Sequence, residues 1–291
     1  MKIIATHDGR FHTDELFAIA ILRLIYPNIR VIRTRDEAKF SKTNYRIDLG
    51  KKYNPKTGDF DHHQLDFKLK RKNNIPYASA GLVWKHFGKK LANFEKGFNY
   101  IDEKIIQPID ALDSGVQIVS KEVIPNYCIG EIINSFTPNW DNKNKDYDKA
   151  FFEALNFVTD LLRREIDYAN SIEEIEKIIK NSIKNSIGKI CILEKQVPWQ
   201  DYIINNTNKL FVIFRAEEGH WYVWSVREEL RNFENRKDLP KKWGGLSGKE
   251  LQKITGVKDA IFCHKNLFTV NAKSKEGAIK LAKLALKEKN I

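Results

Sequence analysis

Residues 3–32, IIATHDGRFHTDELFAIAILRLIYPNIRVI, decide the fold, because they combine a strand, a polar loop, a helix and a second strand. Ile3 to Thr6 form one short apolar run, and Val31-Ile32 form another. Between them, apolar residues recur at helical spacing from Thr13, a good helix N-cap, until Pro27. A strand, a helix and a strand in this order predict a βαβ unit and a mostly parallel sheet.

Imidazoles and carboxylates follow the predicted strands of this sheet. His7 follows the first strand, and Asp48 lies at the end of the strand predicted over residues 45–49. Asp61 follows a turn-rich segment, residues 51–59. Ligands of parallel sheets gather at the carboxyl ends of the strands. We therefore expect these three side chains to converge.

The rest of the chain continues with helices and then a second α/β segment. Helical patterns cover residues 77–87 and 95–111, the second interrupted at Pro108. Residues 137–146 are the most polar and turn-rich stretch, and residues 149–187 alternate apolar and charged residues at helical period. Five further strands and two helices are predicted after them. We predict an α/β protein of three parts: a domain over 1–136, a linker and helical connector over 137–187, and a smaller α/β domain over 188–291.

The bulk composition indicates a soluble globular protein. The 291 residues carry a formal net charge of +12, which favours a polyanionic partner, although Lys-rich usage is also typical of an AT-rich genome. Cys128, Cys191 and Cys263 lie far apart, so neither a zinc knuckle nor a disulfide framework is indicated. No apolar run approaches the roughly 20 residues that cross a bilayer. We expect a cytoplasmic protein.

Asp61-His62-His63 places a carboxylate and two imidazoles in consecutive positions. Imidazole with carboxylate suits a borderline divalent ion such as manganese better than a structural zinc. His7, His12 and Asp14 share one strand-to-helix loop, so their side chains can meet at one point. Two ions about 4 Å apart, bridged by a carboxylate such as Asp61, would suit phosphoester hydrolysis.

A solvated polar side chain is the simpler interpretation of any single one of these positions. Four separate segments with ligand-type residues at strand ends favour a metal site instead. The candidate ligands are His7, His12, Asp14, Asp48, Asp61, His62, His63, Asp110 and Asp113.

At this point the sequence resembles the MYG1 family (UPF0160) of the DHH phosphoesterase superfamily. The resemblance covers nearly the whole chain, and its motifs are highly specific when taken together. They are His7-Asp-Gly-Arg-Phe-His12-Thr-Asp14-Glu15, Ile47-Asp48-Leu-Gly50, Phe60-Asp61-His62-His63-Gln64, Ile109-Asp110-Ala-Leu-Asp113-Ser-Gly115, Trp243-Gly-Gly-Leu and Ile261-Phe-Cys-His264.

The resemblance implies a DHH-type catalytic domain that holds two Mn²⁺ or Mg²⁺ ions, followed by a substrate-binding domain. His7, His12 and Asp14 would form the first metal motif, Asp48 the second, and the Asp61-His62-His63 triplet the third. His12 stands where many superfamily members have an aspartate. The fourth motif is an aspartate near Asp113. Asp110 also stays a candidate, since residues three apart share a helical face.

Substrate-binding candidates lie in both halves of the chain. Lys68, Lys70, Arg71 and Lys72 follow the triplet and could attract an anion, although such a run is also typical of a solvated loop. Gly244 and Gly245 precede Ser247 and Glu250, which have capping-box spacing, so a helix begins there and could hold a phosphate. His264 belongs to the C-terminal motif. Tyr222 and Trp224 should share one strand face and Trp221 the other, and an exposed ring could stack a base.

Three hypotheses follow. The first is a metal-dependent 3′-5′ exonuclease on single-stranded RNA or short oligonucleotides, in which Asp61, His62 and His63 carry catalysis and a metal-bound hydroxide attacks phosphorus. MYG1-like proteins are associated with this activity. The second is hydrolysis of a small phosphate compound, such as a dinucleotide, cyclic dinucleotide or pyrophosphate. The third is a nucleic-acid-binding module without catalysis. A homo-oligomer is compatible with all three, and no membrane partner is expected.

Overall fold

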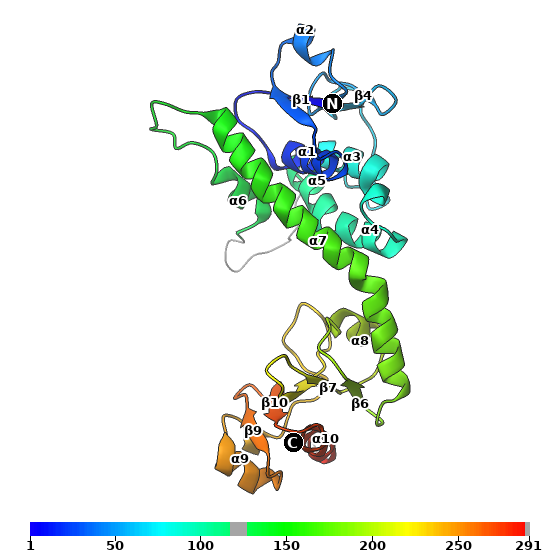
Figure 1. The fold of residues 1–291 in the computed structure, drawn as a ribbon, viewed down its shortest axis with the longest axis vertical. Helices are drawn as coiled ribbons and strands as arrows, with labels where there is room; N and C mark the ends of the chain where they lie inside the picture. Colours follow the sequence, from blue (N-terminus) through cyan, green and yellow to red (C-terminus); the bar gives the residue numbers. More distant parts are fainter. Residues whose placement is uncertain (117–126, 289–291) are drawn as a thin grey trace. The chain divides into compact units, whose positions relative to one another are not determined.

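The computed structural model describes residues 1–116 and 127–288. It separates into two compact units, residues 1–172 and 173–291, each with its own sheet (Figure 1). The predicted mixed α/β class with two sheet-containing parts is confirmed. The unit boundary lies inside one long helix, α7 (Tyr147–Lys184), and the predicted domain boundaries at 136 and 188 stay predictions.

The first unit is built on a five-stranded sheet in the order β2-β1-β3-β5-β4. The strands are β1 (Ile3–Thr6), β2 (Arg30–Arg33), β3 (Tyr45–Ile47), β4 (Tyr53–Asn54) and β5 (Asp59–Phe60). The first four in this order run parallel, and only β4 pairs antiparallel, with β5. The predicted mostly parallel sheet is confirmed, and the carboxyl ends of β1, β3 and β5 lie along one edge.

Helix α1 (Thr13–Ile25) is the centre of this unit. Its residues from Asp14 to Leu22 are all buried, and it contacts α3, α5 and α6 as well as β3. A helix enclosed in this way must be apolar on nearly every side, which explains the run Leu16 to Leu22. The predicted N-cap was wrong by one residue, because His12 and not Thr13 takes the cap position, with Glu15 closing a capping box.

The other elements of the first unit surround α1. They are α2 (Glu37–Phe40), α3 (Ser79–Phe87), η1 (Gly88–Lys90), α4 (Glu95–Ile101), η2 (Asp102–Ile106), α5 (Gln107–Asp113), α6 (Ile129–Asn134) and the first part of α7. The predicted interruption of this helical pattern occurs as η2, a stretch of π-helix that ends at Ile106, and Pro108 lies in the first turn of α5 directly after it.

The second unit contains a five-stranded sheet in the order β6-β7-β8-β10-β9. Its elements are β6 (Ile190–Leu193), α8 (Gln200–Asn206), β7 (Phe211–Arg215), β8 (Trp221–Ser225), η3 (Lys241–Trp243), α9 (Gly248–Thr255), β9 (Ala260–Cys263), β10 (Thr269–Ala272) and α10 (Lys275–Lys287). Only β6 and β7 pair parallel. Separate apolar clusters cover the two faces of the sheet. Trp221 packs into one, and Tyr222 and Trp224 into the other, as the strand alternation predicts.

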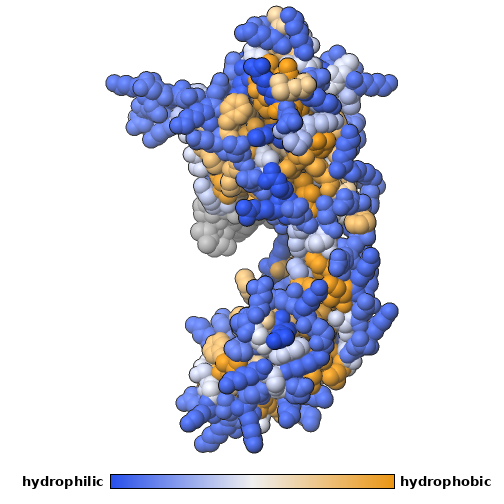
Figure 2. Space-filling view, viewed as in Figure 1, coloured by the Kyte–Doolittle hydropathy of each residue, from blue (hydrophilic) through white to orange (hydrophobic). Residues whose placement is uncertain are grey.

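Hydrophilic residues cover most of the face of each unit seen in Figure 2, with smaller apolar patches between them. Over residues 1–116 and 127–288, no helix combines the length and the apolar character that a membrane span requires.

Candidate metal centre

Neighbouring parallel strands bring the candidate ligands together. His7 follows β1, Asp48 follows β3 and Asp61 follows β5, and these three strands are adjacent in the sheet. All three residues are buried, with exposed fractions of 3%, 7% and 2%. Burial of several ionisable groups at one sheet edge is costly unless they are paired or bind a metal. Burial of these three side chains is not typical of a solvated loop, and it makes this edge a candidate metal centre.

The start of α1 supplies the next side chains. His12 is exposed at the N-cap, whereas Asp14 and Glu15 are buried. The Nε2 atom of His7 contacts the Glu15 carboxylate and lies 3.4 Å from Oδ2 of Asp48. The other ring nitrogen, Nδ1, lies 3.1 Å from the carbonyl oxygen of Asp8. A proton on Nδ1 would hold this contact and leave Nε2 as the metal-binding nitrogen.

Ser79, at the first turn of α3, orients two of the carboxylates. Its backbone N–H donates to Oδ2 of Asp14 at 3.3 Å, and its hydroxyl donates to Oδ1 of Asp48 at 3.4 Å. Ser79 is fully buried. Contacts of this kind fix the direction of metal-ligating side chains.

Potential ligand atoms converge in three groups within residues 1–116. In each group, one ligand atom per residue lies within 4.8 Å of all the others. The groups are His7, His12, Glu15 and Asp48; Asp48, His62 and His63; and His12, Asp14 and Asp113. Asp48 and His12 each belong to two groups, so the groups form one continuous centre. Nitrogen and oxygen donors without a thiolate suit Mn²⁺ or Mg²⁺ and do not resemble a structural zinc site.

Two buried polar atoms in this centre have no hydrogen-bond partner. They are Oδ1 of Asp14 and Nε2 of His62. His62 Nε2 is 3.1 Å from Oδ2 of Asp113 and 3.9 Å from Oδ2 of Asp14, without hydrogen-bond geometry. Orphaned buried atoms are rare in folded proteins and call for an explanation. A divalent ion between these residues would supply one, so the donor set fits a metal.

The ionisation of these groups is strongly interdependent. Burial acts to lower the pKa of His7 and of His62. The neighbouring carboxylates act in the opposite direction and outweigh burial, so the pKa of each imidazole is raised to about 10. Burial and the charge of Asp48 hold the pKa of Asp14 well above its usual range. Burial also acts to raise the pKa of Asp48, but the three imidazoles beside it outweigh this and hold it far below its usual range. A metal ion that binds to these imidazoles must therefore displace protons from them.

Both carboxylate oxygens of Asp61 accept hydrogen bonds from backbone N–H groups of nearby loop residues. Its Oδ2 accepts from the backbone N–H of Lys51 at 2.6 Å, and its Oδ1 accepts from the backbone N–H of His63 at 3.0 Å. The same Oδ1 lies 2.8 Å from Nδ1 of His63, which is also 3.1 Å from Oδ1 of Asp48. Asp61 therefore orients His63, while Asp48 lies at the centre of the cluster. The role of Asp61 as a metal ligand stays a prediction.

The two aspartates of α5 have different surroundings. Asp113 lies beside His62, whereas Asp110 is fully buried and accepts from Arg71 at 2.7 Å and from the backbone N–H of Gly81 at 2.9 Å. Burial raises the pKa of Asp110 to about 7, although Arg71 opposes the shift. Asp113 but not Asp110 belongs to a converging group. The geometry therefore favours Asp113 as the ligand and Asp110 as an internal ion-pair residue.

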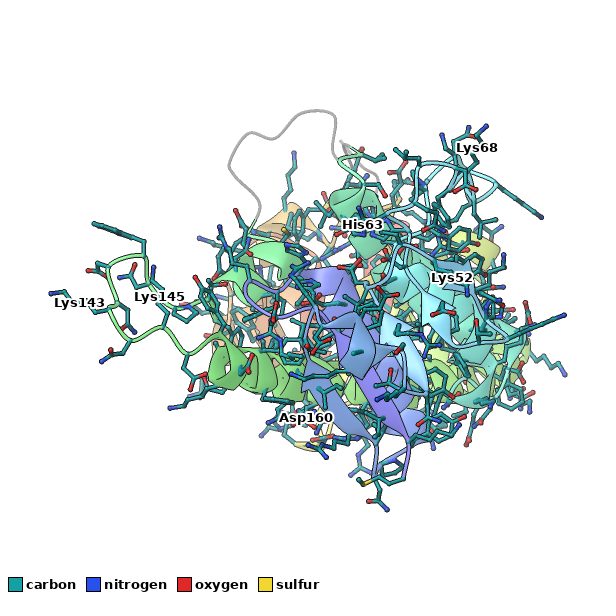
Figure 3. All side chains as sticks on the ribbon, turned by 90° about the horizontal axis from the view of Figure 1, so that it is seen from above. Lys52, His63, Lys68, Lys143, Lys145 and Asp160 are labelled. Carbon is teal, nitrogen blue, oxygen red and sulfur yellow. The ribbon has the colours of Figure 1, made fainter. Side chains whose placement is uncertain are left out.

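Arg71 was expected at the substrate, but its side chain is only 7% exposed. It pairs with Asp102 as well as Asp110 and stacks over the ring of Tyr77. Lys68 and Lys70 are exposed, and Figure 3 shows Lys68 on the loop that follows His63. Lys72 is exposed as well, so three lysines of this charge run remain available to a substrate.

The remaining substrate candidates lie in the second unit. The N–H of Gly244 donates to the carbonyl oxygen of Lys241 and that of Gly245 to the carbonyl oxygen of Cys263, so neither is free for a phosphate. The predicted helix does begin at Gly248, but the side chain of Ser247 makes no capping hydrogen bond. The ring of His264 lies tilted against that of Phe268 and accepts a hydrogen bond from the backbone N–H of Asn266.

Sequence reasoning missed Glu15 and the role of Ser79. Glu15 could have been found from its place three residues after His12, the spacing of a capping box. The small residues around Ser79 suit close packing or close approach to a ligand, but no local pattern shows which carboxylates its hydroxyl contacts. That contact joins residues 31 positions apart.

Two cavities open from the centre and share His12 and His63. One, of about 620 Å³, is also lined by Arg35, Phe40 and Lys51. The other, of about 690 Å³, is also lined by Leu112, Glu131 and Asn134. A molecule in either cavity would contact candidate ligands of the centre.

Alignments with known proteins of similar sequence cover 96–100% of this chain. The model of an uncharacterised protein family (UPF0160), which carries the name MYG1 exonuclease, matches residues 3–286. The MYG1 protein of Dictyostelium discoideum is 30% identical over 311 residues, which cover 96% of this chain and 94% of that protein. The MYG1 exonuclease of Mus musculus is 30% identical over 98% of this chain and 85% of its own length. The MYG1 protein of Chlamydia muridarum is 30% identical over 100% and 98%. The chain belongs to the MYG1 family.

Proposed function

We propose that this protein is a metal-dependent phosphodiesterase that acts as an exonuclease on single-stranded RNA or short oligonucleotides. The observation that carries this proposal is the continuous cluster of buried imidazoles and carboxylates, with orphaned atoms on Asp14 and His62. Relatives in Mus musculus and Homo sapiens carry the name exonuclease. The net charge of +12 supports a polyanionic substrate.

Two divalent ions would bind on either side of Asp48. His7, His12 and Glu15 would complete one site with Asp48, and His62, Asp14 and Asp113 would surround the other. When bound, Mn²⁺ or Mg²⁺ would neutralise charge on the phosphate and lower the pKa of a coordinated water. In this arrangement Asp48, rather than Asp61, would contribute to both sites.

His63 would act on the substrate. Its side chain is 54% exposed, and it lines both cavities. Asp48 and Asp61 hold its Nδ1, which leaves the other ring nitrogen for the substrate. A held, protonated imidazole can neutralise a phosphate oxygen or donate a proton to the leaving oxygen.

The test is a product-length assay on labelled RNA and DNA of about 5 to 20 nucleotides, with and without manganese. Ladders that start at the 3′ end would support a 3′-5′ exonuclease. Replacement of Asp61, His62 and His63 together by alanine should abolish manganese-dependent hydrolysis while the circular dichroism spectrum is retained. Undiminished hydrolysis by that variant would exclude this mechanism.

The size of the cavities favours one alternative. Each holds about 620–690 Å³, the range of a small-molecule site. The alternative substrate is therefore a small phosphate compound, such as a dinucleotide, a cyclic dinucleotide or a pyrophosphate. Cleavage confined to dimers would favour it. Retention of oligonucleotides without cleavage would indicate a catalytically silent binding module.

We also propose that the protein is cytoplasmic. The thiols of Cys128, Cys191 and Cys263 are free, which supports the expected reducing, cytoplasmic location. A homo-oligomer remains compatible with the proposed function.

A further inference from the structure

The two cavities that meet at His12 and His63 differ in charge. Apart from candidate ligands, the first carries Arg35 and Lys51 against one acid, Glu37. We call it the basic cavity. Apart from candidate ligands, the second carries one acid, Glu131, and no lysine or arginine is among its lining residues in the described part of the chain. We call it the acidic cavity.

This difference gives a bound oligonucleotide a direction. The phosphodiester that is cut must lie at the shared histidines, so the nucleotides on its two sides occupy different cavities. On one side the strand continues, with a negative charge at every nucleotide, and cations attract it. On the other side lies the terminal nucleoside, which carries no further charge when its end is a free hydroxyl.

We infer that the acidic cavity receives the terminal nucleoside and that Glu131 selects ends with free hydroxyl groups over ends with a phosphate. This inference rests on the proposed function. A carboxylate accepts hydrogen bonds from sugar hydroxyls and repels a terminal phosphate. An RNA 3′ end presents two such hydroxyls. The apolar side chains of Ile109 and Leu112, and the amide of Asn134, line the same cavity and suit a sugar and a base.

The structure holds Glu131 in place. It is the third residue of α6, and its Oε2 accepts from the backbone N–H of Cys128 at 3.3 Å. This contact takes one carboxylate oxygen and leaves the other for a substrate. Glutamine can make the same capping contact, so Glu131→Gln removes the charge and keeps the helix start.

With the terminal nucleoside in the acidic cavity, the reaction is hydrolysis of the last phosphodiester bond of the strand. Water adds its oxygen to phosphorus, and the bond from phosphorus to the 3′ oxygen of the penultimate sugar breaks. That oxygen takes up a proton, and the terminal nucleoside leaves with a 5′-phosphate. The shortened strand again ends in a free 3′-hydroxyl, which the acidic cavity accepts in the next round.

The test compares RNA of about ten nucleotides that ends in 3′-hydroxyl, in 3′-phosphate or in a 2′,3′-dideoxy sugar, each with a 5′ label. With the full-length wild-type protein and manganese, the 3′-phosphate should lower the initial rate about tenfold or more. The ratio of the initial rate on the 3′-hydroxyl substrate to that on the 3′-phosphate substrate should fall about fivefold in Glu131→Gln. In Glu131→Lys this ratio should be close to one. Glu153→Gln, an exposed change on α7, should leave the ratio unchanged.

Thermal melts would check that each variant is folded. Hydrolysis by the wild type with no discrimination, or discrimination that neither Glu131 variant changes, would overturn the assignment of Glu131 and leave the proposed function standing. No hydrolysis of any oligonucleotide, with manganese present, would overturn the proposed function and this inference together.

Discussion

Asp48 is the residue on which the centre depends. Its carboxylate lies within 3.5 Å of a nitrogen on each of His7, His62 and His63, and it accepts from the hydroxyl of Ser79. Its backbone has φ +52°, a left-handed conformation that aspartate and asparagine tolerate better than other side chains. An aspartate here therefore meets two requirements, a turn after β3 and a carboxylate at the centre of the candidate ligands.

Asp48→Asn tests the two requirements separately. Asparagine tolerates the same left-handed backbone conformation, but it removes the negative charge of the carboxylate. We expect Mn²⁺ affinity to fall about 100-fold or more, measured by isothermal titration calorimetry. Asp160→Asn, on the exposed side of α7, is the control and should change little (Figure 3). Equal affinity in Asp48→Asn and the wild type would contradict the central role of Asp48.

Metal affinity should rise with pH. The imidazoles of His7 and His62 have their pKa raised to about 10, and that of His63 to about 9. Below these values the rings are protonated, so an incoming ion must displace protons, and fewer remain to displace as the pH rises. Calorimetry in two buffers with different ionisation enthalpies should detect proton release at pH 7 and less at pH 9. Affinity that is independent of pH would contradict this ionisation of the apo site.

At the scale of elements, α3 and α5 are joined through a buried hydrogen bond, and the same carboxylate of α5 also pairs with Arg71 in the loop before α3. Asp110 on α5 accepts from Arg71 and from the N–H of Gly81 on α3. A Cβ on Gly81 would overlap the Asp110 carboxylate. Glycine is therefore required here by close approach, although its φ is ordinary.

Gly81→Ala should lower the free energy of unfolding by about 1–3 kcal/mol, since overpacking a core costs that much. Urea denaturation would measure it. Gly130→Ala is a matched control on α6, because a Cβ there would meet its nearest atom at 3.7 Å. It should be neutral or slightly stabilising, as expected for alanine in an open helix position. Equal stability of both variants would show that α3 and α5 can move apart without cost.

Features that depend on residues close together in the sequence were predicted well, and features that depend on contacts between distant residues were not. Strands and helices with strong periodicity, such as β1, α1 and α9, were predicted within about two residues. The short helices α2, α6 and α8 were missed, because four to seven residues carry too little pattern. The convergence of His7 and Asp48 followed from strand ends alone. The pairing of Arg71 with Asp110, 39 residues apart, did not, since only tertiary packing brings them together.

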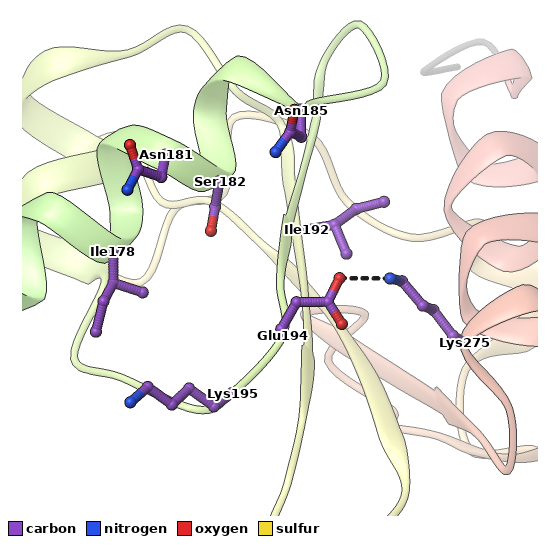
Figure 4. A pocket seen from close by; sticks show the side chains of 8 residues that line it. All are labelled: Ile178, Asn181, Ser182, Asn185, Ile192, Glu194, Lys195 and Lys275. Carbon is purple, nitrogen blue, oxygen red and sulfur yellow. Dashed lines mark hydrogen bonds and ion pairs between the residues drawn. The ribbon is translucent and has the colours of Figure 1, made fainter.

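At the scale of the whole molecule, the question is whether nucleic-acid affinity comes from the general charge of +12 or from the basic cavity. Surface lysines such as Lys143 and Lys145 project from the loop before α7 and do not line either cavity of the centre (Figure 3). A third cavity, in the second unit, has lysines too, but one of them, Lys275, is paired with Glu194 at 2.5 Å (Figure 4). Arg35, which pairs with Asp8 at 3.3 Å, and Lys51 differ from these lysines in lining the cavity beside the candidate ligands.

The salt dependence of binding distinguishes the two sources of affinity. Each phosphate contact to a single strand contributes about 0.7 to the slope of log affinity against log salt. Arg35→Gln with Lys51→Asn should therefore reduce the slope by about 1.4 for RNA of about 15 nucleotides. Asparagine suits position 51, where φ is +50°. Binding would be measured by fluorescence anisotropy with a chelator present, so that the strand is not cut. Lys143→Gln with Lys145→Gln removes the same charge away from the centre and should leave the slope within error. If both double variants lower the slope equally, net charge rather than the basic cavity holds the strand.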